Sequence, residues 1–149
     1  MPPPSMFYTA TRELFQGRID RLTPDSQRRW GTMSVEQMVC HLSDQLRLAL
    51  GVLSARPMAG PLRFAPLRRF AIDYMPWPHG IKGPRESFTT RPAELKSDIA
   101  RLHAQLEQFG SRGAQRDWPE HPLFGTMSGP LWARLTCKHF DHHLRQFGV

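Results

Sequence analysis

The stretch Cys137-Lys138-His139-Phe140-Asp141-His142-His143-Leu144-Arg145-Gln146-Phe147-Gly148 holds three of the seven histidines of the chain. In a helix, which turns by about 100° per residue, His139 and His143 lie one turn apart on the same face. That spacing can present two imidazoles to one metal ion. The spacing also arises by chance, so its meaning depends on its surroundings and on a third ligand.

The pair falls on the apolar side of the helix that this stretch predicts, with Ser128 as its expected cap and Pro130 just inside its start. That side carries Trp132, Leu135, His139, His143, Gln146 and Phe147, whereas Arg134, Lys138, Asp141 and Arg145 lie opposite. His142 lies towards the edge. Burying a neutral imidazole costs free energy unless it is hydrogen-bonded or ligated, so two neighbours call for a shared partner, such as a metal ion. Hydrogen bonds to backbone carbonyls or between the two rings are the alternative.

A second predicted helix offers a third imidazole. Ser34 and Gln37 form a capping-box pattern, and apolar residues at helical spacing predict a helix over 35–53. His41 lies at the shoulder of its apolar stripe. Three imidazoles can complete an open metal site that leaves a position for water or substrate. Asp44, Gln45 and Gln146 are candidates to orient these ligands.

The remaining apolar patterns predict an all-α protein. Further helices are expected over 11–22, 62–75 and 92–109, and no stretch alternates apolar and polar residues as a half-buried strand would. The expected apolar faces are Leu14, Phe15, Ile19 and Leu22 in the first helix and Leu67, Phe70, Ala71 and Tyr74 in the third. Two long irregular connections surround Trp77 and His121. The prediction is a single domain over 1–149, a four-helix bundle with long connecting loops and a loosely packed lead-in over 1–9.

Composition limits the classes of function. The 149 residues include 20 basic ones, and the net charge of +7 makes nucleic acid or an anionic substrate conceivable partners. The arginines are spread along the chain, however, which argues against nucleic acid. No apolar run is long enough for a membrane span, and the start lacks the features of a signal peptide. With only two cysteines, we expect a reducing cytoplasmic location.

The other histidines and the cysteines are weaker candidates for the site. His79 is expected to be a solvated loop residue and His103 a residue at the edge of the core. His121, followed by Pro122, could cap a turn, line the pocket or add a ligand. On helical wheels Cys40 points away from the apolar centre and Cys137 lies off the line of the histidine pair, so we interpret both as structural.

Four blocks of sequence resemble the DinB/YfiT-like metalloenzyme superfamily, in a branch of unknown function. They are residues 30–42 (with Trp30-Gly31-Thr32-Met33-Ser34), Pro76-Trp77-Pro78-His79-Gly80, His121-Pro122-Leu123-Phe124-Gly125 and residues 138–148. The resemblance implies a four-helix bundle that binds a divalent metal, zinc or nickel, through His41, His139 and His143. Many relatives have Arg-Gly-Gln after the last ligand, whereas this chain has Leu144-Arg145-Gln146.

The resemblance also implies candidate activities. Some relatives resemble transferases that conjugate low-molecular-weight thiols, such as glutathione, to small electrophiles, and a metal ion lowers the pKa of a thiol as it does that of water. A metal-dependent hydrolase and a non-catalytic binding protein are the alternatives. Relatives often form homodimers. Trp77, His121 and His142 are candidates to line the pocket or to support the ligands, and the expected partner is a small-molecule substrate.

Overall fold

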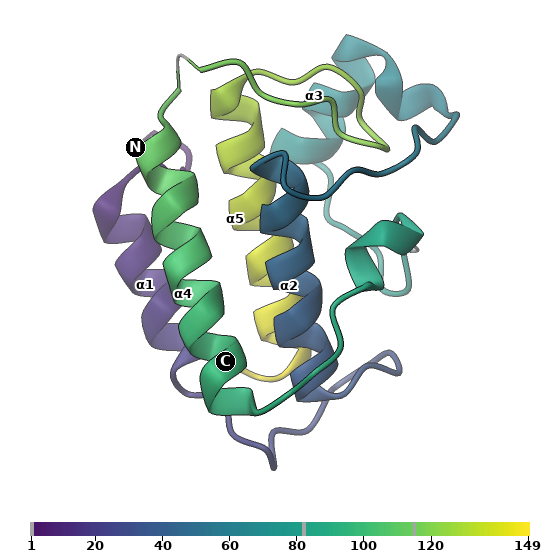
Figure 1. The fold of residues 1–149 in the computed structure, drawn as a ribbon. Helices are drawn as coiled ribbons and strands as arrows, with labels where there is room; N and C mark the ends of the chain where they lie inside the picture. Colours follow the sequence, from purple (N-terminus) through teal and green to yellow (C-terminus); the bar gives the residue numbers. More distant parts are fainter. Residues whose placement is uncertain (1, 82, 115) are drawn as a thin grey trace.

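Five α-helices and two short 3-10 helices form the fold in a computed structural model that describes residues 2–81, 83–114 and 116–149 (Figure 1). They are α1 (Thr9–Ile19), α2 (Val35–Ala49), η1 (Pro61–Arg63), α3 (Ala65–Asp73), η2 (Arg85–Phe88), α4 (Leu95–Arg112) and α5 (Gly129–Gln146). Met1, in the predicted lead-in, and Lys82 and Gln115, in the two predicted connections, lie outside the described residues.

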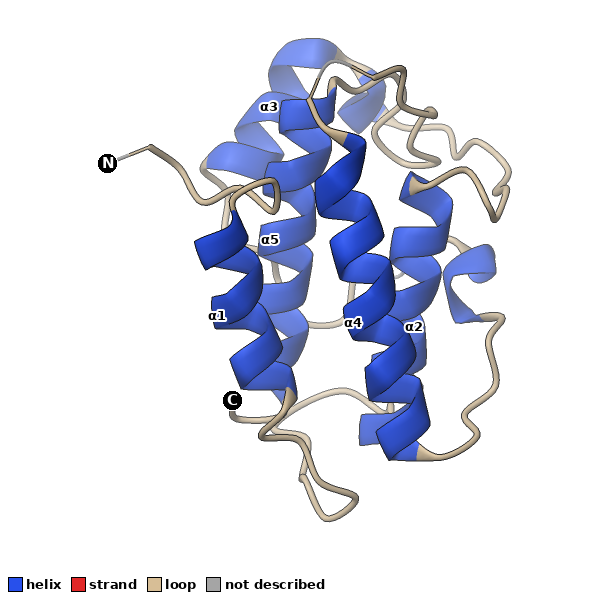
Figure 2. Cartoon of the chain, turned by 60° about the vertical axis from the view of Figure 1, so that its left-hand side comes forward, coloured by secondary structure: helices blue, strands red, loops and turns tan. Residues whose placement is uncertain are grey.

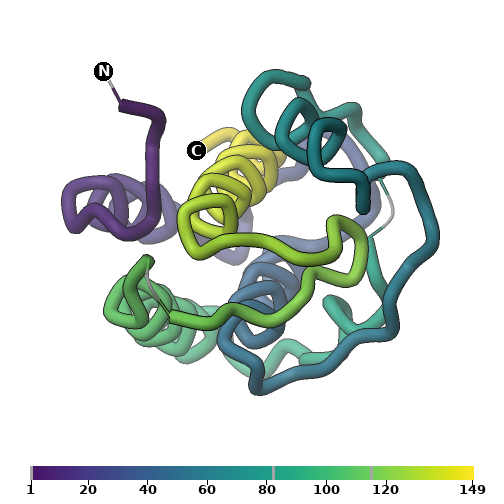
Figure 3. The backbone as a smooth tube through the Cα atoms, turned by 90° about the horizontal axis from the view of Figure 1, so that it is seen from above, coloured from purple at the N-terminus to yellow at the C-terminus, as the bar shows by residue number. Residues whose placement is uncertain are grey.

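The predicted all-α bundle is confirmed. Helices α1, α2, α4 and α5 run alongside one another, and α3 lies outside them against α5 (Figures 1 and 3). Within the described ranges no strand forms, and the connections are loops apart from η1 and η2 (Figure 2). The bundle centre is filled by fully buried side chains, the largest being Trp132, Phe109 and Phe140. No helix among the described residues is both long and apolar enough to cross a membrane.

The two helices that carry the histidines begin where their capping residues predict. The Ser34 hydroxyl accepts from the backbone N–H of Gln37 at 3.2 Å, and the Gln37 side chain accepts from the backbone N–H of Ser34 at 2.9 Å. Ser128 caps α5 by accepting from the N–H of Leu131 at 3.3 Å. Pro130 lies in the first turn, where its missing N–H costs nothing.

Helix boundaries elsewhere differ from prediction by a few residues. α1 begins and ends earlier than the predicted span of 11–22. α2 ends at Ala49 instead of residue 53, because Gly51 turns the chain with a φ of 75°. α4 begins at Leu95, after Pro92, and continues through Gly110, where an added side chain would collide with the guanidinium of Arg12.

Some predicted apolar positions face solvent. Leu14 is 64% exposed, and in α3 Ala71 and its neighbour Ile72 are buried, while Leu67, Phe70 and Tyr74 are 44%, 56% and 76% exposed. The reason is geometric: α3 contacts the bundle along one narrow strip, whereas a helix inside a bundle is covered on several sides. The prediction of apolar faces was wrong at these positions.

The lead-in is also better packed than predicted. Pro2, Pro3 and Pro4 are exposed, but Met6 is fully buried in the core. Arg12 holds this segment, because its guanidinium donates to the carbonyls of Met6 and Phe7, each at 2.9 Å. The start of the chain therefore closes one end of the core.

Candidate metal centre

Three buried imidazoles meet between α2 and α5. His41 comes from α2, and His139 and His143 come from successive turns of α5. Their candidate ligand atoms all lie within 4.8 Å of one another, and the Nε2 atoms of His41 and His139 are 3.0 Å apart. Among the described residues this is the one group of three or more potential ligand side chains so arranged. The structure thus brings together the three histidines that the sequence singled out.

A backbone carbonyl fixes the His41 ring. Its Nδ1 lies 2.8 Å from the carbonyl oxygen of Ser87, and a carbonyl can only accept, so Nδ1 carries the proton. The lone pair of Nε2 is therefore left facing the other imidazoles. Phe88 stacks on the ring at 4.4 Å between centroids with an interplanar angle of 9°. η2 therefore sets both the tautomer and the tilt of this side chain.

A relay through Gln146 fixes the His143 ring. The Gln146 amide nitrogen donates to the carbonyl of Trp30 at 2.9 Å, which leaves its oxygen to accept from His143 Nδ1 at 2.8 Å. Nε2 of His143 consequently also presents a lone pair. Gly31 makes room for this relay: its φ is 79°, and a Cβ there would lie 2.6 Å from the Gln146 amide nitrogen.

His139 differs from the other two, because its Nδ1 is buried without a partner among the described residues. Burial lowers the pKa of all three imidazoles, that of His143 to about 3 and that of His139 well below its ordinary value. The three are therefore neutral at pH 7, the state in which histidine binds metal. Neutral imidazoles, two oriented lone pairs and one underpartnered ring fit a divalent ion.

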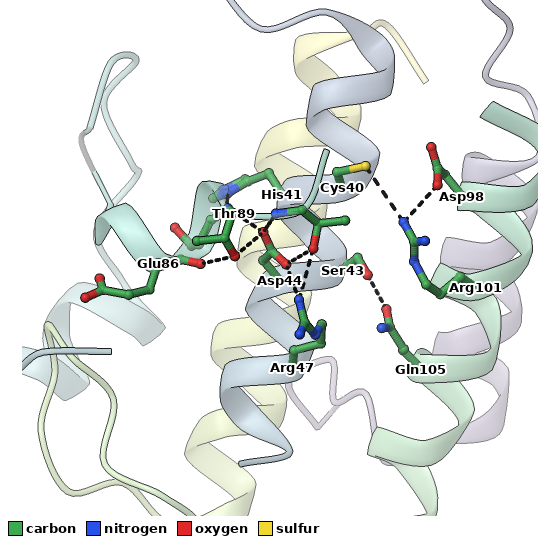
Figure 4. A network of polar contacts seen from close by, with 12 residues as sticks. Cys40, His41, Ser43, Asp44, Arg47, Glu86, Thr89, Asp98, Arg101 and Gln105 are labelled. Carbon is green, nitrogen blue, oxygen red and sulfur yellow. Dashed lines mark hydrogen bonds and ion pairs between the residues drawn. The ribbon is translucent and has the colours of Figure 1, made fainter. Parts of the chain in front are cut away.

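Asp44, a candidate to orient the ligands, supports the site through the segment that follows η2. Its buried carboxylate accepts from the backbone N–H groups of Thr89 and Thr90, each at 2.9 Å, and from Arg47 at 3.0 Å (Figure 4). Among the described residues it makes no hydrogen bond to a histidine. It instead anchors the segment that brings the Ser87 carbonyl to His41.

The cysteines take no part in the cluster. Cys40 is buried against α4, with its sulfur 3.9 Å from Arg101, and it is not part of the hydrophobic core cluster, as expected for a residue that points away from the apolar centre (Figure 4). Burial raises the pKa of Cys40 to about 11 and that of Cys137 to about 12, so both are thiols at neutral pH. Both cysteines are free. Buried thiols of this kind fit the structural role that we predicted for them.

A cavity of about 160 Å³ adjoins the three histidines. Gln45, Trp77, His121 and His142, four of the predicted supporting residues, line it. The remaining lining is mostly apolar, with Met33, Phe88 and Leu135 among its side chains. None of the described lining residues is an arginine, a lysine or a carboxylate. The cavity therefore offers imidazoles and one amide in otherwise apolar surroundings.

The other histidines lie apart from the cluster of ligand atoms. His79 is exposed, as predicted, and stacks on Trp30 at 3.8 Å between centroids. His103 lies at the edge of the core, 2.7 Å from Asp20. The Ser87 and Trp30 carbonyls were missed from the sequence, since a backbone carbonyl has no residue-type signature. For the Trp30 carbonyl the sequence does hold a clue, because Gly31, shortly before the Ser34 cap, allows a turn that brings the backbone close to Gln146.

A four-helix bundle with three histidines converging beside a cavity defines a class of protein, the helical bundles with a candidate metal centre between their helices. The family model of the DinB superfamily matches residues 8–147. The chain therefore belongs to the DinB superfamily, which confirms the resemblance drawn from its sequence. Comparisons with curated proteins and with solved structures found no match.

Proposed function

We propose that this protein binds a divalent metal ion, zinc or nickel, through His41, His139 and His143 and uses it to transfer a small thiol to an electrophile. The observation that carries the proposal is the orientation of the rings. Ser87 and Gln146 hold the outer nitrogens of His41 and His143, so both Nε2 lone pairs face the third imidazole beside a cavity. Oxygen acceptors on the outer nitrogen of a ligand histidine are typical of metal sites.

The residues around the centre have different roles in the proposed reaction. When bound, a divalent ion would lower the pKa of a thiol or of water that coordinates it. Ser87 and Gln146 keep the rings oriented, and the apolar lining limits the access of bulk water. Trp77 and Phe88 supply apolar surface for the organic part of a ligand. The chain thus contributes ligands, their orientation and a shaped, mostly apolar space.

The apolar lining favours an organic thiol over water as the nucleophile. A hydrolase would use the same centre, and a binding protein would use the cavity without chemistry. None of the described lining residues is cationic, so we infer that the carboxylates of an anionic thiol such as glutathione stay outside the cavity, near surface arginines. A cytoplasmic location, which keeps thiols reduced, a homodimer and the absence of nucleic-acid partners belong to the same proposal.

Metal analysis of protein purified without chelators tests the centre. We expect about one zinc or nickel ion per chain in the wild type and almost none in His143→Ala, because a three-histidine site loses most of its affinity with one ligand. His103→Ala is the matched control, since His103 lies outside the cluster and should leave the metal content unchanged. A wild type without stoichiometric metal would contradict the proposal.

Activity assays then separate the candidate reactions. Metal-loaded protein is mixed with glutathione and 1-chloro-2,4-dinitrobenzene, or with 4-nitrophenyl acetate alone. A transferase conjugates the first pair, and a hydrolase cleaves the ester without thiol. In either case the turnover should disappear in His143→Ala and persist in His103→Ala.

A further inference from the structure

His121 is a buried imidazole whose proton position is fixed by the turn that contains it. Its Nδ1 accepts from the backbone N–H groups of Leu123 at 3.0 Å and Phe124 at 3.2 Å. The turn is closed by paired backbone hydrogen bonds between His121 and Gly125 at 2.8 and 2.9 Å. Because Nδ1 accepts, the proton of the neutral ring resides on Nε2.

The Nε2–H group of His121 lacks an acceptor among the described residues, although the side chain is only 5% exposed. The ring packs against Phe124 and Trp132, with centroids 4.9 and 5.1 Å away, and it lines the cavity beside the three histidines. Nδ1 faces the turn, so the opposite edge of the ring, with Nε2, points away from it. A donor that has no protein partner in a mostly apolar cavity gains a hydrogen bond when a ligand supplies an acceptor.

His121 lies close enough to the metal centre to act on the same ligand. The side chains of His121 and His139 line the same cavity, which has a volume of about 160 Å³. His121 is nonetheless unsuited to bind the metal ion itself, because the Nδ1 lone pair is used by the turn and Nε2 carries a proton. The sequence left three roles open for His121. The structure supports two of them at once, because the side chain caps a turn and also lines the pocket.

We propose that His121 donates its Nε2–H to an acceptor atom of the ligand in this cavity, so that the site selects small molecules with an apolar body and an acceptor beside the metal-binding atom. The inference rests on the proposed function, since it assigns the ligand class of the same site. Trp77, Phe88 and Leu135 receive the apolar body. His121 acts on the bound molecule, while His41, His139 and His143 hold the ion.

Two substitutions separate the two nitrogens of His121. In His121→Asn, the side-chain oxygen takes the place of Nδ1 and keeps the acceptor for the turn, but the Nε2 donor is lost. In His121→Gln, the longer amide reaches the place of Nε2 and keeps a donor, but the acceptor for Leu123 and Phe124 is lost. Asn should therefore preserve stability and weaken ligand binding, and Gln should do the reverse.

The test uses cobalt(II)-loaded protein, in which ligand binding changes the visible absorption of the ion. Azide, which offers acceptor atoms beyond the one that binds cobalt, should bind His121→Asn at least about tenfold more weakly than wild type, as expected for a lost hydrogen bond to a charged group. 1-Methylimidazole binds through one nitrogen and carries a methyl on the other, so it offers no acceptor. Its affinity should be the same in wild type and His121→Asn.

The outcomes distinguish this inference from the proposed function. Wild-type affinity for azide in His121→Asn, or equal weakening of both probes, overturns the role of His121 while leaving the metal centre intact. Failure of the wild type to bind cobalt overturns the metal centre and this inference with it. If His121→Asn does not fold, azide binding by His121→Gln decides: near wild-type affinity supports the inference, and a tenfold loss overturns it.

Discussion

The polar side chains on the two sides of α2 differ in how completely they are hydrogen-bonded within the protein. On the side facing α4 and the segment after η2, the polar side chains have protein partners: Ser43 donates to Gln105, Arg101 lies between Cys40 and Asp98, and Asp44 accepts from Thr89 and Thr90 (Figure 4). On the side facing α5, His41 keeps one acceptor, the Ser87 carbonyl, but directs its Nε2 at His139, 3.0 Å away beside the cavity, and the Gln45 side chain makes no hydrogen bond within the described residues.

The difference separates structural from functional polar groups. Buried polar groups that are fully paired hold helices together, and their contribution is stability. Groups left unpaired around a cavity cost stability and are retained where a ligand completes them. On this view the first side of α2 should respond to substitution through folding, and the second through binding.

Removing Asp44 tests the structural side with the largest expected effect. Asp44→Ala leaves two backbone N–H groups and Arg47 without their buried acceptor, so we expect a loss of about 3–5 kcal/mol in the free energy of unfolding. Urea denaturation measures it. Asp20→Ala removes an exposed partner of His103 and should cost less than about 1 kcal/mol. Comparable losses in the two variants would mean that the buried carboxylate of Asp44 stabilises the fold no more than an exposed one.

Removing Gln146 tests the binding side. Without its oxygen, His143 is free to rotate and to change tautomer, so Gln146→Ala should weaken metal affinity by about 10–100-fold. Competition with a chromophoric chelator gives the dissociation constant. Gln105→Ala is the matched control, because it removes the same amide on the structural side, where metal affinity should not change. An equal effect of the two substitutions would mean that the relay to Trp30 does not orient the ligand.

The fold was predictable because it depends on local rules. Capping residues and apolar spacing placed the starts of α2 and α5, and the wheel of α5 placed its histidine pair on the buried side. The errors fell where tertiary packing overrides spacing. α3 has the apolar residues of a core helix, yet it packs through Ala71 and leaves Phe70 exposed.

The site was predictable only as far as residue types carry information. His41, His139 and His143 were recognisable, and so was Gln146, three residues after the last histidine. Asp44 was recognisable as a candidate, but its partners were not, since a helical wheel does not show which loop will cover it. The contact with the Ser87 carbonyl could not be predicted from the sequence, because any residue at that position of η2 would provide the same backbone oxygen.

Acid should destabilise the metal-free protein through its buried imidazoles. Burial lowers the pKa of His121 to about 3. Between pH 6.5 and 3 this imidazole is therefore protonated in the unfolded chain and neutral in the folded chain, which favours unfolding. The contribution of His121 to stability is thus complete above about pH 6.5 and is lost as the pH falls towards 3, by about 1.4 kcal/mol over the first pH unit.

His121→Asn isolates one such proton, since it removes the imidazole and keeps the turn acceptor. Urea unfolding of the metal-free proteins at pH 7.5 and 5.5 should show a smaller acid-induced loss in His121→Asn than in wild type, by about 1.4 kcal/mol. An acid-induced loss in His121→Asn as large as that in wild type would show that the fold does not hold this imidazole neutral.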